Sequence, residues 1–422
     1  MASGPNGGGN GGGGGGGLMK NMSLLRLQYY CVLGAVAGAV LFATLRYMPA
    51  AGSGAALSTT SALATAAAPA GSGAGAGEHR KIKGTAPAPA KAAAKVVTKP
   101  KEVVVFNFGD SNSDTGGVAA IMGIRISAPE GRAYFHHPTG RLSDGRVVLD
   151  FICETLNTHH LSPYMKPLGS DYSNGVNFAI AGATATPGDT PFSLDVQIDQ
   201  FIFYRDRCND SITRDEPAPL NMLDFERALY TMDIGQNDIT SILYLPYDEI
   251  LHKNGARKFW IHGTGALGCL PAKLAMPRAS DGDLDEHGCI AKFNNAAKRF
   301  NTLLSEACDD LRLLLKKSSI IFVDMFAIKY DLVANHTKHG IEKPLMTCCG
   351  HGGPPYNYDP KQSCMGDSMD LCKLGDKFIS WDGVHFTDAA NSIVASMAIS
   401  GEYSVPRMKL TSLVKPAKSK AS

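Results

Sequence analysis

The sequence predicts an α/β fold built around a parallel β-sheet, because short apolar strands alternate with helical segments over one long stretch of the chain. Four apolar runs have the length and composition of buried strands: Val103–Phe108, Ala228–Ile234, Arg257–His262 and Ser319–Asp324. Two segments have the apolar spacing of helices: Val147–Leu156 and the long amphipathic Phe293–Lys316. Right-handed crossovers between such strands place helices on both faces of the sheet.

The first of these strands leads directly into Gly109-Asp110-Ser111-Asn112-Ser113-Asp114-Thr115-Gly116. Ser111 is therefore expected at the carboxyl end of a strand, the edge where open α/β sheets gather ligands and reactive side chains. A serine presented there by a glycine-bounded turn is a candidate nucleophile. A second Gly-Asp-Ser, at 366–368, follows no strand and lies between Cys364 and Cys372, so we interpret that copy as a loop.

The stretch Trp381-Asp382-Gly383-Val384-His385 places an aspartate three residues before a histidine near the end of the predicted domain. This spacing allows one loop to hold the carboxylate of Asp382 against one imidazole nitrogen of His385, while the other nitrogen faces a serine. The alternative is a helix-capping aspartate with a surface histidine. With Ser111 in the same chain, we favour a Ser-His-Asp arrangement.

Two further segments supply candidate donors for a negatively charged oxygen. Asn237 follows the second apolar run, so its side-chain amide is predicted at a strand end, where it can donate to an oxyanion. Gly182 lies in the small-residue stretch 175–183, where a backbone N–H can approach a substrate oxygen. The alternatives are a turn-forming asparagine and a glycine required only for backbone geometry.

These segments, in this order, resemble the plant GDSL esterase/lipase family within the SGNH hydrolases. The resemblance runs from about Val103 to about Pro406 and includes Pro138–Arg146, Gly265–Pro271 and Cys348-Cys349-Gly350. It implies the SGNH hydrolase fold, a flavodoxin-like three-layer α/β/α sandwich with a parallel sheet. The chain lacks a Gly-x-Ser-x-Gly elbow, which argues against the α/β-hydrolase fold.

By the same resemblance, Ser111 is the nucleophile, His385 is the general base and then the general acid, and Asp382 orients the histidine. The backbone N–H of Ser111, together with Gly182 and Asn237, completes the oxyanion hole. The resemblance implies a serine ester hydrolase that works through an acyl-enzyme and needs neither a cofactor nor a metal.

The chain departs from the family pattern in two places. Related plant sequences carry a longer helical crossover than the segment 240–254, which is close to the minimum of about a dozen residues needed to join parallel strands. A shortened crossover beside Asn237 puts the oxyanion hole, and therefore the activity, in question. The second departure is at Gly263 and Ala266, where the family commonly has Asn and Pro.

The first hundred residues differ in composition from the catalytic domain predicted at 102–407. Residues 1–26 are rich in glycine and are expected to form a disordered cytoplasmic tail. Residues 27–45 form an uncharged apolar run long enough to span a membrane as a signal anchor. Residues 46–101 are rich in Ala, Pro and Lys, which predicts a flexible stem.

The basic residues around the apolar run favour a type II orientation. Lys20 and Arg26 precede the run and only Arg46 follows it closely, so the positive-inside rule places the N-terminus in the cytoplasm and the enzyme in a lumen. The short span is more typical of the thinner membranes of the early secretory pathway. The alternative is a signal peptide cleaved after Pro49, followed by secretion.

Nine of the ten cysteines lie outside the apolar run. Four cluster between Cys348 and Cys372, which predicts disulfides formed in an oxidising compartment. The odd total predicts that one thiol stays free or pairs with another chain. The alternative is a zinc site that includes His351, although the spacing matches no common zinc pattern. The glycosylation sequons at Asn209 and Asn335 are usable only in a lumen.

The charge distribution does not indicate nucleic-acid binding, because the net charge is only +2. Basic residues gather outside the domain, in the stem and in the tail 408–422, which we expect to be flexible. We expect Asp114 and Asp238 to be structural. The histidine pairs 136–137 and 159–160 are expected on the surface or in loops rather than at a metal site.

These observations predict a Golgi enzyme that removes O-acetyl groups from cell-wall polysaccharide of the xylan type. An anchor keeps such an enzyme beside membrane-bound synthetic machinery, and the small residues around Gly182 suit an acetyl group. One alternative is a secreted or membrane-bound lipase or acyl esterase. Another is a catalytically impaired carbohydrate-binding or scaffolding protein with a shortened crossover after Asn237.

Overall fold

The computed structural model describes residues 103–187, 191–238, 251, 253–278, 280–362, 364–366 and 368–414. The predicted tail 1–26, apolar run 27–45 and stem 46–101 lie outside the described residues, as does the end of the chain from residue 415. None of the helices in the described ranges is long and apolar enough to cross a membrane.

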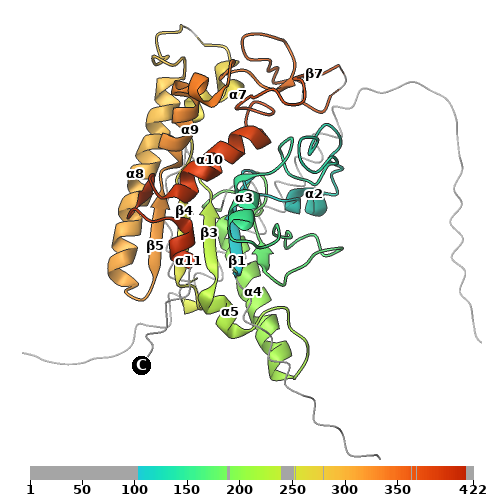
Figure 1. Cartoon of the computed structure of the whole chain (residues 1–422), viewed down its shortest axis with the longest axis vertical. Coiled ribbons are helices and arrows are strands. Elements are labelled where there is room, and N and C mark those ends of the chain that lie inside the picture. Colours follow the sequence, from blue (N-terminus) through green and yellow to red (C-terminus); the bar gives the residue numbers. More distant parts are fainter. Residues whose placement is uncertain are drawn as a thin grey trace, which may run out of the picture. The chain divides into compact units, whose positions relative to one another are not determined.

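A six-stranded sheet lies at the centre of the domain, with the order β2-β1-β3-β4-β5-β8 (Figure 1). Its strands are β1 (Val105–Gly109), β2 (Gly175–Asn177), β3 (Leu229–Asp233), β4 (Lys258–His262), β5 (Ser319–Val323) and β8 (Ser404–Val405). The first five strands pair in parallel, and β8 is antiparallel to β5. The four strands predicted from apolar runs are β1, β3, β4 and β5, with bounds that differ by one or two residues.

Helices connect the strands, and further helices follow β5, the last of the parallel strands. The α-helices are α2 (Gly117–Met122), α3 (Val148–Thr155), α4 (Leu194–Thr213), α5 (Met222–Arg227), α7 (Pro271–Leu274), α8 (Ala291–Leu314), α9 (Met325–Ala334), α10 (Asp388–Ser400) and α11 (Leu410–Val414). Two short 3₁₀ helices are η1 (Leu267–Cys269) and η2 (His336–His339). The two helices predicted from periodicity are α3 and α8.

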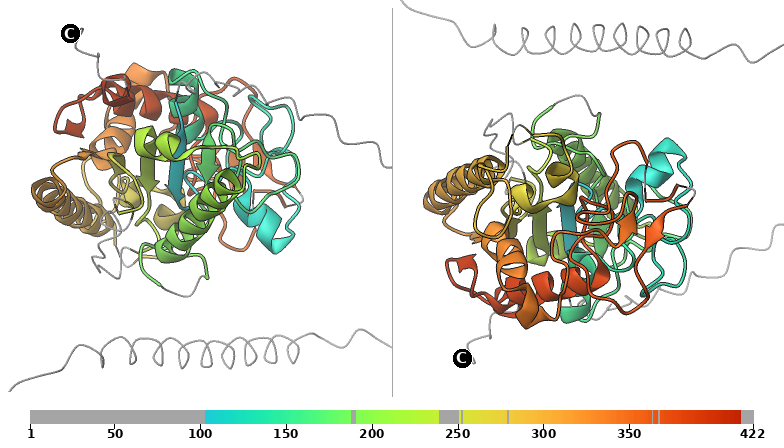
Figure 2. Two further views of the ribbon diagram at one scale, coloured as in Figure 1. Left: turned by 90° about the horizontal axis from the view of Figure 1, so that it is seen from below. Right: turned by 90° about the horizontal axis from the view of Figure 1, so that it is seen from above.

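Helices cover both faces of the sheet, as the two views in Figure 2 show. Successive side chains of a strand point to opposite faces. In β1, Val105 packs into an apolar cluster with residues of α3, α9, α10 and α11. Phe106 and Phe108 pack into the opposite cluster, with residues of α4, α5 and α8. This arrangement confirms the predicted three-layer α/β/α sandwich.

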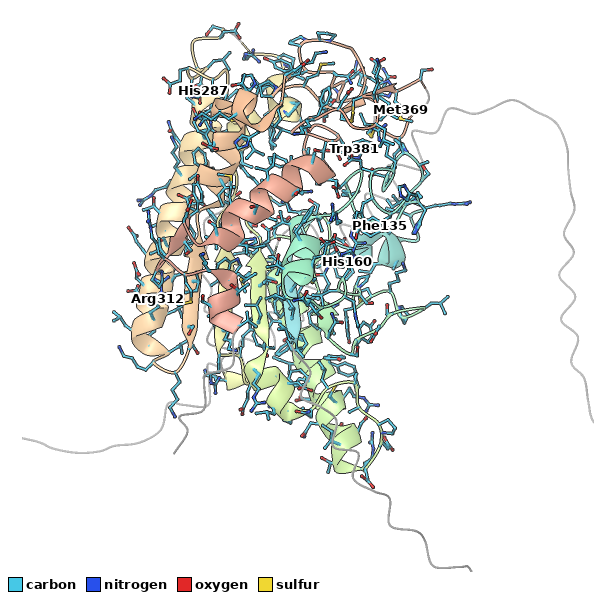
Figure 3. All side chains as sticks on the ribbon, viewed as in Figure 1. Phe135, His160, His287, Arg312, Met369 and Trp381 are labelled. Carbon is cyan, nitrogen blue, oxygen red and sulfur yellow. A yellow bond between two sulfur atoms is a disulfide. The ribbon has the colours of Figure 1, made fainter. Side chains whose placement is uncertain are left out.

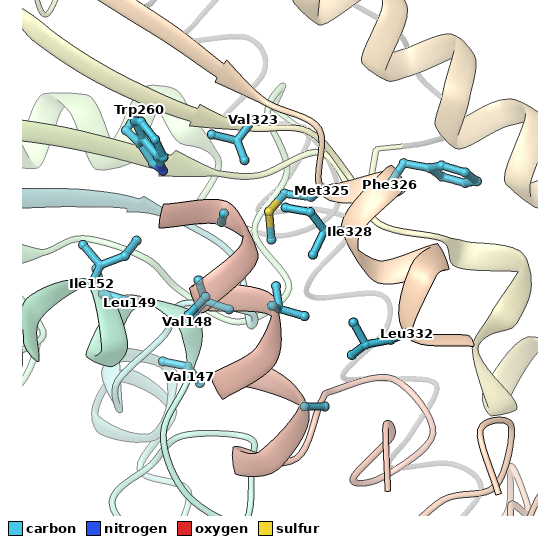
Figure 4. Close-up of a cluster of buried hydrophobic side chains, with 14 of the residues drawn as sticks. Val147, Val148, Leu149, Ile152, Trp260, Val323, Met325, Phe326, Ile328 and Leu332 are labelled. Atoms are coloured by element: carbon cyan, nitrogen blue, oxygen red, sulfur yellow. The ribbon is translucent and has the colours of Figure 1, made fainter. Parts of the chain in front are cut away.

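Figure 4 shows part of the first cluster, where side chains of α3 and α9 meet the sheet. Trp260 of β4 is fully buried there and belongs to the same cluster as Ile152 of α3 and Met325 of α9. Burying an aliphatic or aromatic side chain of this size stabilises the fold by about 1.5–3 kcal/mol. The core thus holds the strand ends at one edge of the sheet in fixed positions.

The domain extends further along the chain than its sequence predicts. The composition predicts that the domain ends at residue 407, before a basic tail at 408–422, but α11 (Leu410–Val414) lies beyond that point. Leu410, Leu413 and Val414 are buried in the first apolar cluster, so the folded unit continues to Val414. Lysines flank this short apolar segment on both sides, so the composition of the region looks like that of a basic tail.

Three disulfides are present in the described residues: Cys269–Cys289, Cys348–Cys372 and Cys349–Cys364. The predicted stapling of the loop between 348 and 372 is confirmed, and it takes up all four cysteines of the zinc alternative, which is therefore wrong. A small antiparallel pair, β6 (Cys349–Gly350) and β7 (Asp370–Leu371), lies within this loop.

The prediction of a single remaining thiol is wrong, because three buried cysteines lie outside the disulfides. These are Cys153 of α3, Cys208 of α4 and Cys308 of α8. Each packs within one of the two apolar clusters. A cysteine at such a position behaves as a small apolar side chain, so parity of the cysteine count was a poor guide to the pairing.

Candidate active site

The turn that carries Ser111 begins where β1 ends. Gln197 of α4 holds this strand end, because its side chain accepts a hydrogen bond from the Gly109 N–H and donates one to the Gly109 carbonyl oxygen, both 2.9 Å long. The next residue, Asp110, donates its backbone N–H to the carbonyl oxygen of Asp233 at the end of β3. Ser111 comes two residues after the end of β1 and therefore lies at the carboxyl edge of the sheet, where the sequence predicts it. Its exposed fraction is 7%.

Asp114 fixes the far side of the same turn. Its two carboxyl oxygens accept hydrogen bonds from the backbone N–H groups of Gly116, Gly117 and Val118, at 2.6–3.0 Å. One of them also accepts the N–H of Ala181, at 2.9 Å. The structural role predicted for Asp114 is confirmed, and the bond to Ala181 joins the serine turn to the segment that carries Gly182.

Asp382 and His385 lie on one loop before α10. His385 Nδ1 is 2.6 Å from Asp382 Oδ2, and Asp382 Oδ1 accepts the backbone N–H groups of Val384 and His385. The side chain of Asp382 is 19% exposed, and that of His385 is 13% exposed. Burial opposes the charged imidazole, but the carboxylate of Asp382 outweighs it and raises the pKa of His385. Burial alone would raise the pKa of Asp382, but the adjacent imidazole of His385 acts in the opposite direction, and the pKa lies below its ordinary value.

The disulfide-linked loop holds the backbone just before Asp382. The N–H of Cys348 donates to the carbonyl oxygen of Ser380 at 2.9 Å, and that of Cys349 donates to Trp381 at 2.8 Å. Trp381, labelled in Figure 3, is fully buried. It packs in one cluster with Cys348, Cys349 and Cys364. The disulfides therefore support the segment that presents the aspartate and the histidine.

Gly383 allows the tight turn between these two residues. Its φ of 101° lies in a region that side chains with a Cβ rarely adopt. A Cβ at this position would also lie 2.4 Å from the ring of Tyr358. The Gly383 carbonyl oxygen accepts the N–H of Ala272 in α7, so a second element holds the loop in place.

The serine turn and the histidine loop face each other. The ammonium of Lys329 is 3.5 Å from Asn112 Oδ1, and it lies 4.8 Å from the ring centre of Phe386. Asn112 follows Ser111 and Phe386 follows His385, so a single side chain contacts the neighbours of both residues. The negative charge of Asp110 also acts on His385.

The predicted oxyanion donors come from the ends of β2 and β3. Asn237 is exposed, and its Nδ2 donates one hydrogen to the Ala183 carbonyl oxygen at 2.8 Å, which leaves its second amide hydrogen for another acceptor. Gly182, with a φ of 83°, precedes Ala183. No backbone carbonyl of the described residues accepts the Ser111 N–H, which leaves it available as an oxyanion donor. Asp238 accepts the N–H of Ala185 at 2.8 Å, which confirms its structural role.

Two buried carboxyl groups beside the site were not identified from the sequence. Asp110 is fully buried, and burial, with the negative charge of Asp233, raises its pKa to about 7. Glu130 is 2% exposed, and burial, with the charge of Asp382, raises its pKa to about 8. Both lie far in the sequence from the histidine that they influence, so no local spacing reveals them.

The second Gly-Asp-Ser is a loop, as predicted. Ser368 lies in a turn with a φ of 63°, two residues before β7, whereas residue 367 lies outside the described residues. The predicted histidine pairs lie at the surface or in local contacts. His136 and His137 are exposed, His159 is exposed beside Asp171, and His160 contacts Glu154 at 3.0 Å. No group of histidine, cysteine and carboxylate ligands suited to a metal occurs in the described part of the chain.

The two departures from the family pattern have different outcomes. Most of the crossover 240–254 lies outside the described residues, but the strands on either side of it, β3 and β4, pair in parallel over five residues each. At Gly263, a Cβ would lie 2.7 Å from Asn301 Oδ1. The Asn301 side chain bonds both the N–H and the carbonyl oxygen of Thr264. Asn301 therefore occupies the space above Gly263 and holds this loop.

Comparison with known proteins gives consistent matches. The family model described as GDSL-like Lipase/Acylhydrolase matches residues 105–397. The chain is 47% identical over 326 residues to a GDSL esterase/lipase of Arabidopsis thaliana, covering 72% of this chain and 88% of the relative. It is 39% identical to an esterase of Hevea brasiliensis, covering 72% and 87%, and 37% identical to Alpha-L-fucosidase 3 of Arabidopsis thaliana, covering 69% and 88%.

Proposed function

The chain belongs to the GDSL-like lipase/acylhydrolase family and is a serine ester hydrolase, and from this premise we propose that it removes O-acetyl groups from cell-wall polysaccharide of the xylan type. The hydrogen-bonded Asp382–His385 pair beside the serine turn is the observation that carries the reaction type. The acyl and alcohol specificity rest on the further observations below.

The proposed reaction follows from the positions of these groups. Ser111 Oγ attacks the acetyl carbonyl carbon while His385 takes its proton, and Asp382 stabilises the imidazolium that forms. The N–H groups of Ser111 and Gly182 and the amide of Asn237 donate to the oxyanion. The sugar hydroxyl leaves with the proton from His385. Water then attacks the acetyl-serine, and acetate and free Ser111 are released.

Small side chains favour a short acyl group. Ala181 is partly exposed and precedes Gly182 in the segment proposed to form one side of the oxyanion hole, whereas Ala183 is buried in the core. A methyl side chain beside a glycine offers little apolar surface to a long acyl chain, whereas an acetyl group needs little. A carbohydrate alcohol is supported by the relative that is named for hydrolysis of a sugar bond, Alpha-L-fucosidase 3.

We also propose that the enzyme is a single-pass type II protein of the Golgi membrane. The apolar run 27–45 and the stem 46–101 support this location, and the disulfides suit an oxidising lumen. In intact vesicles, an epitope at the C-terminus is expected to resist protease until detergent is added. A soluble protein whose N-terminus lies after Pro49 would instead support the cleaved-signal alternative.

One substrate panel tests the specificity. The purified protein is incubated with acetylated xylan, a long-chain triglyceride, p-nitrophenyl acetate and p-nitrophenyl fucoside, with Ser111→Ala as the blank. We expect acetate release from xylan and from the small acetate ester, and none in the blank. Preference for the triglyceride would favour the lipase alternative. A folded wild-type protein without turnover would favour the impaired scaffold.

A further inference from the structure

Three neighbouring strands bring charged side chains together directly behind the serine turn. The parallel register pairs Gly109 of β1 with Asp233 of β3, and Asp233 with His262 of β4. Asp110 follows Gly109 and donates its N–H to the Asp233 carbonyl oxygen at 3.1 Å. Two carboxyl groups and an imidazole therefore lie at one sheet edge, on three adjacent strands.

This cluster is shielded from water and incompletely hydrogen-bonded. Asp110 is 0% exposed and His262 is 3% exposed, and the side chain of Asp233 is 13% exposed. Asp110 Oδ2 and both ring nitrogens of His262 have no hydrogen-bond partner among the described residues. His262 Nδ1 is 3.8 Å from Asp233 Oδ2. Because two buried carboxyl groups repel each other when both are ionised, a positive charge nearby stabilises their ionised forms.

Lys329 of α9 supplies that charge. It is 8% exposed. The contact with His262 first, and the Lys329 ammonium second, lower the pKa of Asp233 against the effect of burial. The ammonium also opposes the rise that burial causes in the pKa of Asp110. Gly265 makes room for it, because a Cβ on Gly265 would lie 2.5 Å from Lys329 Cδ. The other residues that line the small cavity beside Lys329 carry no negative charge, so the nearest counter-charges are in the Asp110–Asp233 cluster.

The same ammonium reaches both halves of the active site. It lies 3.5 Å from Asn112 Oδ1, and Asn112 in turn donates its backbone N–H and its Nδ2 to Asp110 Oδ1, each at 2.9 Å. On the other side it lies against the ring of Phe386, the residue after His385. A cation over an aromatic ring is attracted to it. Lys329 therefore links the flanks of the proposed nucleophile and base.

We propose that Lys329 is a positioning residue for the hydrolytic reaction: by neutralising the buried Asp110–Asp233 carboxyl pair and contacting Asn112 and Phe386, it holds the serine turn and the histidine loop at their reacting distance. The inference rests on the proposed function in that Ser111 and His385 are the reacting groups. Lys329 itself touches neither the substrate nor the reacting atoms in this role.

The test replaces Lys329 by methionine, which keeps the length of the side chain but removes its charge. The full-length Lys329→Met protein is assayed with p-nitrophenyl acetate, and kcat is expressed per active site titrated with a fluorophosphonate. We expect kcat per site to fall by about 10- to 100-fold, since a displacement of about 1 Å costs up to about 100-fold. KM should change by less than about twofold.

Charge removal from the cluster should rescue the variant. In Asp233→Asn/Lys329→Met one of the two buried carboxyl groups can no longer be charged, so kcat per site should be at least about threefold higher than the product of the two single effects predicts. Lys298→Met is the matched control, because Lys298 is exposed on α8 and lies over the rings of Phe326 and Tyr330 rather than beside the serine turn. It should keep the wild-type kcat.

The outcomes separate this inference from the proposed function. An unchanged kcat per site in Lys329→Met, or a double variant without rescue, would overturn the inference. If the wild-type protein hydrolyses no ester, the proposed function fails. Thermal unfolding then still tests the charge cluster: Lys329→Met should unfold at a lower temperature than wild type, and the unfolding temperature of the double variant should rise again. Equal unfolding temperatures for wild type and Lys329→Met would then overturn the inference on its own.

Discussion

Asp382 holds His385 at two points: its Oδ2 lies 2.6 Å from the imidazole Nδ1, and its Oδ1 accepts the backbone N–H of the same histidine at 2.8 Å. The side chain and the main chain of the histidine are therefore oriented by one carboxylate. Because that carboxylate also stabilises the protonated ring, it influences both the geometry and the pH dependence of the site.

Replacing Asp382 by asparagine should lower the rate and move its pH dependence. The neutral form of His385 accepts the serine proton, and the anion of Asp382 raises the pKa of His385 above its ordinary value. Without the anion this pKa falls, so the acid limb of kcat/KM should move to lower pH, while kcat drops by about 10⁴-fold. A pH-rate profile with p-nitrophenyl acetate measures both. An acid limb that stays in place, or moves to higher pH, would contradict this assignment.

Ser111→Ala should abolish ester hydrolysis while the protein still folds. Loss of a nucleophile in a Ser-His-Asp arrangement lowers the rate by about 10⁴-fold or more, and His385→Ala should behave in the same way. Ser368→Ala, in the second Gly-Asp-Ser, is the matched control and should keep the wild-type rate. Circular dichroism checks the fold of each variant. Equal activity in Ser111→Ala and wild type would remove the nucleophile assignment.

The predictable parts of this fold are those that local patterns encode. The apolar strand followed by Gly109 predicted the position of Ser111, and the three-residue spacing of Asp382 and His385 predicted their contact. Parallel strands end at one sheet edge, so Asn237 could be placed near the same site. These inferences need only secondary-structure periodicity and short spacings.

The supporting residues could not be predicted in this way. Gln197 holds Gly109 from 88 residues away, and Lys329 reaches Asn112 across 217 residues. Glu130 faces the histidine loop from a stretch with no motif of its own. Such contacts depend on how helices and loops pack over the sheet, and a buried glutamate looks in the sequence like any surface glutamate.

Removing the disulfide between Cys348 and Cys372 should weaken both the fold and the catalytic loop. Its sequence separation is 24 residues, for which the lost constraint on the unfolded chain corresponds to about 3–4 kcal/mol. The Cys348→Ser/Cys372→Ser variant should also lose activity, because the backbone of Cys348 supports Ser380 before the loop. Thermal unfolding and kcat measure the two effects.

A buried cysteine outside the disulfides supplies the control for that experiment. Cys153 packs in α3, so Cys153→Ala removes a sulfur without removing a cross-link. We expect it to cost about 1 kcal/mol and to leave kcat near the wild-type value. An equal loss of stability in Cys153→Ala and in the double serine variant would show that the cross-link itself contributes little.

The stability of the protein should depend on pH through Glu130. Burial raises the pKa of this carboxyl from an ordinary 4.5 to about 8, so the folded state favours its protonated form. For a group with a raised pKa in the folded state, the stabilisation is complete below the unfolded-state value and is lost as the pH rises toward about 8. Glu130→Gln carries a permanently neutral side chain of the same size. The variant should therefore gain stability relative to wild type as the pH increases.

Thermal unfolding of wild type and Glu130→Gln at about pH 5 and about pH 9 measures this effect. The difference in unfolding temperature, variant minus wild type, should be larger at the higher pH, because only wild type then has to bury a carboxylate beside Asp382. Glu286→Gln is the control, since the Glu286 side chain is 83% exposed and its removal should shift the unfolding temperature equally at both pH values. A difference for Glu130→Gln that does not change with pH would show that Glu130 keeps its charge in the folded protein, and its place beside the histidine loop would then require a cation.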